Sequence, residues 1–140
     1  MRHVVFRLER DRYALPLSAI REVVVAPTEY TRVPRAPVSV KGVVNLRGRV
    51  VPVVDLRALL EVAPHPTAVS TRLILLELGR RELGLLITDV DGVESIEKVT
   101  PSPQALAPMV RGLARVGALA ITVLDPEGVD AAVARAFANR

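Results

Sequence analysis

The residue types that usually carry out enzyme chemistry are few in this chain and form no catalytic pattern. Cysteine is absent from all 140 residues, which excludes disulfides and thiolate chemistry. His3 and His65 lie far apart, without carboxylates at metal-ligand spacing, so no zinc site is predicted. Neither a G-x-S-x-G elbow nor a phosphate-binding loop with G-K-S/T is present. We therefore expect a protein that is not an enzyme and that holds no metal or cofactor.

The closely spaced carboxylates Asp89 and Asp91 are the remaining candidates for chemistry. On a strand the two side chains would point the same way, as a paired acid and base require. The surrounding string T-D-V-D-G, residues 88–92, has Asp and Gly in the places that a turn favours. We therefore interpret this segment as a turn.

Charge and composition leave one alternative from another functional class, a small basic β-barrel that binds nucleic acid. The formal net charge is +4. The arginines are scattered and aromatic residues make up only 3% of the chain, whereas single-strand binders need a stacking platform. The chain has no stretch of eighteen consecutive apolar residues, so no membrane-spanning helix is predicted. The charged N-terminus is unlike a signal peptide. Together with the lack of cysteine, this favours a cytoplasmic protein.

The elements that would position a site come from an internal repeat with an offset of seventy residues. At this shift identical residues coincide, including Leu8 with Leu78, Leu15 with Leu85, Val23 with Val93, Gly42 with Gly112, Val53 with Val123 and Asp55 with Asp125. Two copies of one β-rich unit would form a groove between them. The predicted subdomains are residues 1–65 and 66–140 of one domain, 1–140, and an exchange of elements between them is left open.

Alternating apolar residues predict the same strands in both copies. In the first copy these are 3–9, 12–17, 22–26, 43–46 and 49–54, with a short helix at 56–60 capped by Asp55. In the second copy they are 71–78, 82–88 and 112–124, followed by a helix that begins at Pro126 after the cap Asp125. Its apolar stripe is expected to dock on the body of the protein. Short strands at regular spacing predict an all-β fold of two small antiparallel barrels.

Residues 41–57, K-G-V-V-N-L-R-G-R-V-V-P-V-V-D-L-R, are too specific to be a generic hairpin. This string resembles the signature of the CheW-like domain family. The signature residues are Gly42, Asn45, Gly48, Pro52 and Asp55. Further segments follow in family order, among them R-Y-A-L-P-L-S-A-I-R-E-V at 12–23 and E-L-G-L-L-I-T-D-V-D-G-V at 82–93.

The resemblance implies two linked five-stranded SH3-like barrels and a non-catalytic adaptor. Members of the family couple the cytoplasmic tips of methyl-accepting chemoreceptors to the regulatory domain of a CheA-type histidine kinase. By position, Ile20, Val90 and Val93 match residues at the receptor groove, and Glu22 and Arg47 match residues associated with array function. The chain itself would be a monomer or weakly self-associating. An adaptor of a chemosensory-like pathway that controls pili or gene regulation is the alternative within the same fold.

Several of these residues also have a simpler structural interpretation. Ile20, Val90 and Val93 are aliphatic and would fit a core, and Lys41 and Arg57 would fit a solvated surface. Thr88 stands where the family often has aspartate, which puts a local contact in question.

The repeat makes one further prediction, which concerns Glu22 and Arg47. At the offset of seventy these residues fall on Gly92 and Gly117, so both charges are present in the first copy and absent from the second. Losing one alone would leave its partner unpaired, whereas losing both leaves nothing unpaired. We therefore predict an ion pair between Glu22 and Arg47, at the turn of the signature hairpin.

Overall fold

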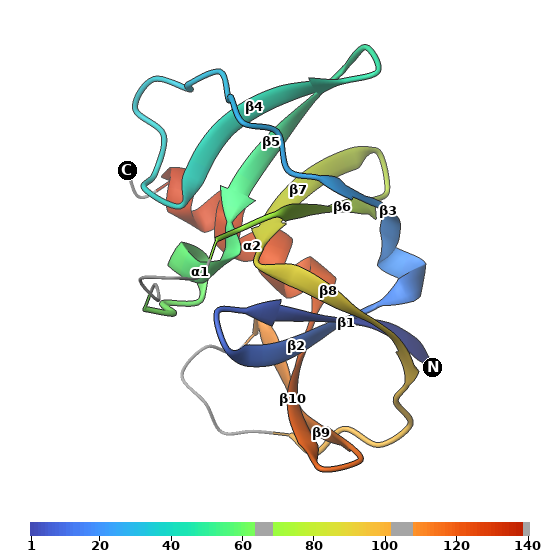
Figure 1. The fold of residues 1–140 in the computed structure, drawn as a ribbon. Coiled ribbons are helices and arrows are strands. Elements are labelled where there is room, and N and C mark those ends of the chain that lie inside the picture. Colours follow the sequence, from blue (N-terminus) through green and yellow to red (C-terminus); the bar gives the residue numbers. More distant parts are fainter. Residues whose placement is uncertain (64–68, 102–107, 139–140) are drawn as a thin grey trace.

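The computed structural model describes residues 1–63, 69–101 and 108–138 (Figure 1). The strands are β1 (Arg2–Leu8), β2 (Asp11–Pro16), β3 (Ile20–Val25), β4 (Val40–Leu46), β5 (Arg49–Asp55), β6 (Arg72–Leu78), β7 (Arg81–Ile87), β8 (Asp89–Ser95), β9 (Val110–Val116) and β10 (Leu119–Leu124). The helices are the 3₁₀ turn η1 (Leu17–Ala19), α1 (Leu56–Leu59) and the C-terminal α2 (Pro126–Ala138).

The strands form two five-stranded sheets, in the orders β8-β1-β2-β10-β9 and β3-β6-β7-β5-β4. These are called sheet A and sheet B below. The predicted fold class, mainly β with two five-stranded units, short helices and a C-terminal helix, is confirmed. Two details differ from the prediction, because the sheets are not closed barrels and each contains one parallel pair, β2 with β10 and β5 with β7.

Each sheet takes strands from both halves of the chain. The β1–β2 hairpin joins β8, β9 and β10 of the second half, and the β6–β7 hairpin joins β3, β4 and β5 of the first half. A boundary near residue 65 therefore separates the two copies in the sequence, but not the two sheets in space.

The single residue Thr88 between β7 and β8 explains why the hairpins are exchanged. In sheet A, Asp89 lies opposite Arg7, whose counterpart in the second copy is Glu77. If β8 instead paired with β6 of its own half in this register, its first residue, Asp89, would lie beside Glu77. The last residue of β7, Ile87, lies beside Arg72 at the other end of β6. These positions are about 17 Å apart along a strand, and two Cα steps span only about 7 Å. The chain must therefore cross to the other sheet.

The strand registers confirm the repeat. Val4 lies opposite Leu15 in β1 and β2, and their counterparts Ile74 and Leu85 lie opposite each other in β6 and β7. The parallel pairs repeat in the same way, with Ala14 opposite Val123 and Gly84 opposite Val53. The two sheets are thus built to one plan and related by a pseudo-twofold exchange.

The turn predicted at residues 88–92 is wrong, because this segment begins β8. Val90 lies opposite Phe6 and Gly92 opposite Val5, so Asp91 is the extra residue of a β-bulge. Aspartate and glycine occur in β-bulges as well as in turns, because a bulge and a turn each interrupt the regular pairing of strands. The first copy has the same irregularity, where Ile20 and Glu22 lie opposite consecutive residues and Arg21 is the extra residue.

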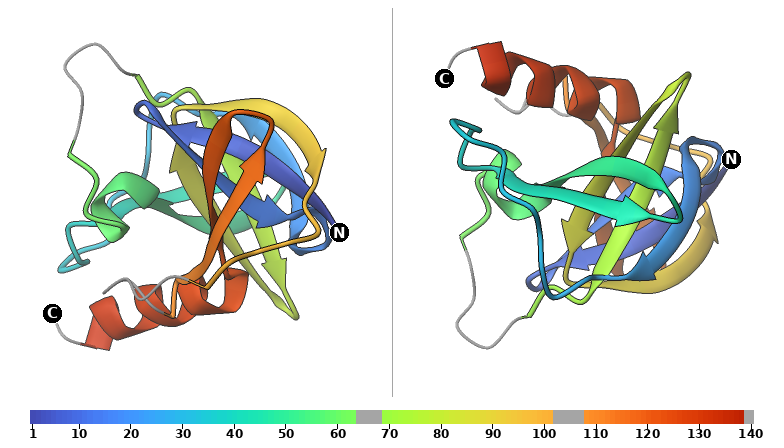
Figure 2. Two further views of the ribbon diagram at one scale, coloured as in Figure 1. Left: turned by 90° about the horizontal axis from the view of Figure 1, so that it is seen from below. Right: turned by 90° about the horizontal axis from the view of Figure 1, so that it is seen from above.

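The largest hydrophobic cluster contains residues of both sheets together with α1 and α2. Val129, Ala132 and Val133 of α2 are buried in it, so the predicted docking of this helix is confirmed. Figure 2 shows α2 along one side of the sheets in both views. Two smaller clusters lie one in each sheet, around Ile121 in sheet A and around Val51 in sheet B.

Candidate partner-binding surface

The signature residues build a tight hairpin between β4 and β5. Arg47 and Gly48 form its two-residue turn, with φ angles of 52° and 85°, as a type I′ turn requires. The side chain of Asn45 accepts a hydrogen bond from the backbone N–H of Gly48 at 2.9 Å. Gly42 has a φ of 144°, and a Cβ there would lie 2.4 Å from the backbone oxygen of Thr31. Three of the five predicted signature positions are therefore fixed by backbone geometry.

The other two signature positions lie on β5. Pro52 faces Val43 of β4 and precedes Val53, where the parallel pairing with β7 begins. Asp55 caps α1 as predicted, accepting a hydrogen bond from the N–H of Arg57 at 3.0 Å.

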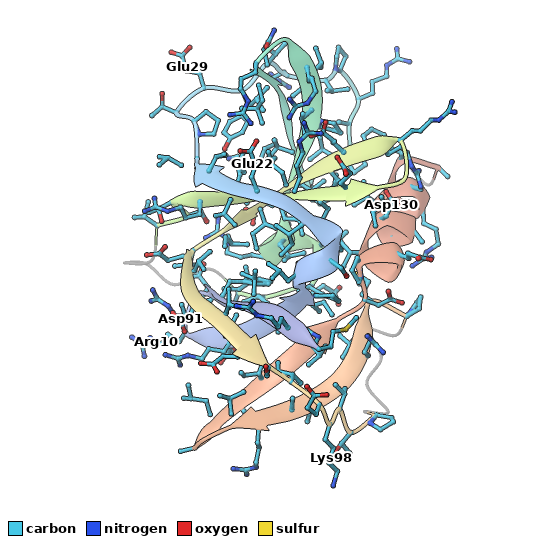
Figure 3. All side chains as sticks on the ribbon, turned by 90° about the vertical axis from the view of Figure 1, so that its right-hand side faces the viewer. Arg10, Glu22, Glu29, Asp91, Lys98 and Asp130 are labelled. Atoms are coloured by element: carbon cyan, nitrogen blue, oxygen red, sulfur yellow. The ribbon has the colours of Figure 1, made fainter. Side chains whose placement is uncertain are left out.

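The ion pair predicted from the repeat is confirmed. An Nη atom of Arg47 donates to a carboxylate oxygen of Glu22, which joins β3 to the β4–β5 turn. The Arg47 side chain is 64% exposed and that of Glu22 is 29% exposed. Most of the Arg47 side chain therefore stays accessible to a partner while its direction is set by Glu22, which is labelled in Figure 3.

Arg47 occupies a backbone conformation that suits glycine. Its φ of 52° lies in the left-handed region, and Gly117, its counterpart in the second copy, has a φ of 60°. A side chain at such a φ costs about 1–2 kcal/mol relative to a right-handed conformation. The first copy keeps an arginine against this cost, which indicates that the side chain has a role of its own.

Beside this pair, a row of charges crosses the end of sheet B. Arg49 binds Glu82 at 2.7 Å, and Arg21 lies 3.7 Å from the same carboxylate. The hydrogen bond from Arg49 lowers the pKa of Glu82 below its ordinary value of 4.5.

The aliphatic candidates lie on β3 and β8, which are edge strands of sheets B and A. Ile20 and Val90 are half-buried and pack against the main core, whereas Val93 is 44% exposed. Val23, the counterpart of Val93, is also 38% exposed; the sequence reasoning did not select it, although the repeat pairs these two valines. We call Ile20, Val23, Val90 and Val93 the aliphatic strip, and Figure 3 shows both strands on one side of the molecule.

Arg57, expected to be a solvated residue, instead lies in a partly buried ion network, so that expectation is wrong. It contacts Glu9 at 2.7 Å and Asp55 at 2.9 Å, and the Glu9 side chain is only 6% exposed. Both carboxylates raise the pKa of the Arg57 guanidinium. Glu9 belongs to the β1–β2 turn of sheet A, whereas Arg57 follows β5 of sheet B. The network therefore connects the two sheets. It depends on the exchange of hairpins between the two halves of the chain, which the sequence repeat did not specify.

Two other sequence expectations have a structural outcome. The ammonium of Lys41 lies 5.7 Å from the centre of the Tyr30 ring, so this lysine has a cation–π contact. The Thr88 hydroxyl accepts a hydrogen bond from the Glu9 N–H at 2.8 Å. Thr88 thus satisfies a buried backbone donor at the position where the family often has aspartate.

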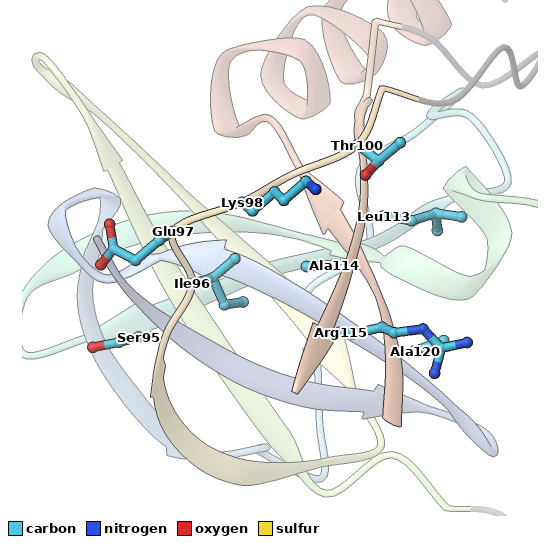
Figure 4. A pocket seen from close by; sticks show the side chains of 9 residues that line it. All are labelled: Ser95, Ile96, Glu97, Lys98, Thr100, Leu113, Ala114, Arg115 and Ala120. Carbon is cyan, nitrogen blue, oxygen red and sulfur yellow. The ribbon is translucent and has the colours of Figure 1, made fainter. Parts of the chain in front are cut away.

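A separate hollow of about 500 Å³ lies between the segment after β8 and the β9–β10 hairpin (Figure 4). Its lining includes Ile96 and Leu113, with Lys98 and Arg115 at its side. Leu113 is 46% exposed. This hollow combines apolar residues with charges of both signs, because Glu97 also lines it, and it contains none of the predicted site residues.

The part of the chain that the structure describes contains no group of three or more His, Asp or Glu side chains placed to hold a metal. His3 is buried, with its Nδ1 atom 3.0 Å from the Met1 carbonyl oxygen, and His65 lies outside the described residues. Within the same described ranges, no helix is long and apolar enough to cross a membrane.

Comparison with known proteins shows similarity to CheW-like proteins along most of the chain. The family profile described as "CheW-like domain" matches residues 2–132. The "Probable chemotaxis protein CheW" of Rhizobium etli is 31% identical over 120 residues, covering 84% of this chain and 76% of that protein. "Protein PilI" of Pseudomonas aeruginosa is 30% identical over 114 residues, covering 77% and 64%.

A solved structure, described as the scaffolding protein TtCheW from Thermoanaerobacter tengcongensis, superimposes with a TM-score of 0.79 and 27% identity, covering 89% of this chain and 88% of that one. The exchanged sheets and the signature hairpin thus define a two-sheet, SH3-like domain of the kind found in a chemotaxis scaffold. The chain belongs to the CheW-like domain family.

Proposed function

We propose that this protein is a non-catalytic scaffold that couples chemoreceptors to a CheA-type histidine kinase in a cytoplasmic signalling array. The observation that carries this proposal is the β4–β5 hairpin, where Arg47 keeps a side chain at a glycine-like φ and is oriented by Glu22. Such a side chain adds little to the stability of the fold, so its value lies in what it contacts. The similarity to chemotaxis proteins named CheW supports this assignment.

In this proposal the aliphatic strip receives the helical tip of a receptor. A helix that docks in a groove is held by the burial of its apolar face against aliphatic side chains. Val93 and Val23 offer exposed methyl groups for this purpose, at 44% and 38% exposure, while the half-buried Ile20 and Val90 anchor the strip to the core.

The kinase domain would contact a different surface, at the ends of the sheets. Arg47 lies at the β4–β5 turn of sheet B, where it pairs with Glu22 of β3, and the hollow beside Leu113 lies at the β9–β10 hairpin of sheet A. We assign kinase pairing to these ends because they combine apolar surface with positioned charge, the arrangement that sets specificity at protein interfaces.

The relationship to Protein PilI of Pseudomonas aeruginosa favours a second candidate, an adaptor of a chemosensory-like pathway with another output. This candidate has the same scaffold role and differs only in the receptors and kinase that are bound. The partner kinase encoded in the same genome distinguishes the two.

Binding measurements on paired variants test the assignment of surfaces. Val93→Glu would bring a carboxylate into an apolar contact, which is costly without a partner, and we expect receptor-tip binding to fall at least about tenfold. Kinase binding should stay within about twofold of the unmodified chain. Val38→Glu is the matched control, because Val38 is 96% exposed and outside the strip, and it should change neither affinity.

Equal loss of both partners in a folded Val93→Glu protein would show that the two surfaces are not separate. Unchanged receptor binding would remove the strip from the proposal. Circular dichroism on each variant establishes that the fold is intact before the affinities are compared.

A further inference from the structure

Each sheet carries a triad of charges at the same pseudo-equivalent place, and the signs of the two triads are opposite. In sheet A, Asp91 binds Arg7 at 2.9 Å and Arg12 at 2.8 Å. In sheet B, Arg21 binds Glu77 at 2.9 Å and lies 3.7 Å from Glu82. At the offset of seventy residues, Arg7 falls on Glu77, Arg12 on Glu82 and Arg21 on Asp91. Every member of one triad is thus replaced by the opposite charge in the other.

Neither hairpin can neutralise itself. Arg7 lies directly opposite Arg12 in β1 and β2, and Glu77 lies directly opposite Glu82 in β6 and β7. Like charges opposite each other on neighbouring strands are destabilising. Each hairpin is therefore stabilised by opposite charges from other strands, which are Asp91 for β1–β2 and Arg21 together with Arg49 for β6–β7.

The third charge comes from a β-bulge in both sheets. Asp91 is the extra residue of the bulge in β8, and Arg21 is the extra residue of the bulge in β3. A bulge redirects a side chain away from the regular alternation of its strand, and here each charge reaches the hairpin; Asp91 is labelled in Figure 3. All these side chains remain partly exposed, between 16% and 48%.

The charges matter because the two halves of the chain share one plan. Since each half gives its hairpin to the other half, the first halves of two molecules could in principle exchange hairpins with each other, and so could the second halves. In that arrangement Arg7 and Arg12 would meet Arg21, and Glu77 and Glu82 would meet Asp91. Both triads would then contain three like charges.

We propose that these inverted triads form a recognition code that makes each half of the chain pair with the unlike half and not with the same half of a second copy. The short Thr88 connection already forces an exchange, and the triads exclude the like half of a second copy as the partner. The unlike half of a second copy carries the same complementary charges as the unlike half of the same chain, so between these two the covalent connection within the chain makes the choice. For a scaffold that works among many neighbouring copies, the triads thus remove the pairing of like halves.

A variant that keeps every triad attractive while erasing the code tests this proposal. In Arg7→Glu/Arg12→Glu/Asp91→Arg, both hairpins are acidic and both bulges carry arginine, so like halves also attract. The sevenfold variant adds Arg21→Asp/Glu77→Arg/Glu82→Arg and also Arg49→Glu, because Arg49 binds Glu82 at 2.7 Å; it inverts both triads and restores the code. Each protein is refolded from urea at increasing concentration, and its mass is measured by size-exclusion chromatography with light scattering.

We expect the threefold variant to form about ten times more dimer than the unmodified chain, the ratio given by about 1.4 kcal/mol between pairings. This dimer should persist on dilution, because exchanged hairpins must unfold to separate. The sevenfold variant should return to the monomer fraction of the unmodified chain. Equal dimer fractions in the threefold variant and the unmodified chain, or a dimer that persists in the sevenfold variant, would overturn the proposal. If the threefold variant does not fold, Arg21→Asp/Arg49→Glu/Glu77→Arg/Glu82→Arg alone makes both hairpins basic and decides the question by the same criteria.

Discussion

Replacing Arg47 by glycine should separate its role in binding from its role in folding. Glycine adopts the observed φ of 52° without the cost of about 1–2 kcal/mol that a side chain meets there. The substitution also removes the ion pair to Glu22, which contributes about 0.5 kcal/mol because the Arg47 side chain is 64% exposed. Glycine also lowers the unfolding free energy by roughly 0.5–1 kcal/mol, because it gives the unfolded chain more conformational entropy. The unfolding free energy of Arg47→Gly should therefore lie between about 0.5 kcal/mol below and about 1 kcal/mol above that of the unmodified chain.

Arg47→Ala is the matched comparison, because alanine loses the ion pair and keeps the strained φ. We expect it to be about 1 kcal/mol less stable than Arg47→Gly. Urea unfolding followed by circular dichroism gives both values, and a cycle with Glu22→Ala should show a coupling of about 0.5 kcal/mol.

Partner binding should not follow this order of stability. If Arg47 acts through its side chain, the glycine and alanine variants lose kinase or array binding to the same extent, although one is more stable. Wild-type affinity in Arg47→Gly, or an alanine variant that is more stable than the glycine variant, would refute the reasoning.

Three further predictions concern the fold and its charge. Arg57→Ala leaves the buried Glu9 carboxylate without its arginine, so the unfolding free energy should fall by about 3 kcal/mol, measured in urea; a loss below about 1 kcal/mol would contradict the network. Because the pKa of Glu82 is lowered in the folded chain, this residue contributes stability above about pH 4.5 that is lost as the pH falls through its lower folded value. Glu82→Gln should therefore flatten the acid limb of the stability profile. A loss of stability that is the same at neutral pH and along the whole acid limb would count against this. Binding to random DNA should be weak and show no salt slope typical of several phosphate contacts, and a steep slope in a salt titration would favour the nucleic-acid alternative.

The repeat predicted both the strand plan and the Glu22–Arg47 pair, because an ion pair that is lost as a unit leaves a trace in two aligned copies. It did not determine which hairpin joins which sheet. That choice depends on the single residue between β7 and β8 and on the pairing of distant strands, neither of which is visible in local periodicity. Arg57 was misjudged for this reason, since its partner Glu9 is supplied by the other sheet.

Local turn signals misled the prediction at residues 88–92, where Asp91 and Gly92 form a bulge. Glycine and aspartate mark a departure from regular pairing, but not its kind. The residues Ile20, Glu22, Arg47, Val90 and Val93 remain predictions as a partner-binding set, because burial and ion pairing describe a surface without its partner.

Reconstitution with partners from the same genome tests the central proposal most directly. The purified chain, the CheA-type kinase and a receptor cytoplasmic fragment on vesicles are combined, and kinase autophosphorylation is measured with and without the chain. The proposal predicts that receptor control of the kinase requires the chain, and that Val93→Glu abolishes this control while Val38→Glu preserves it. Full receptor control in the absence of the chain, or no effect of adding it, would contradict a coupling role.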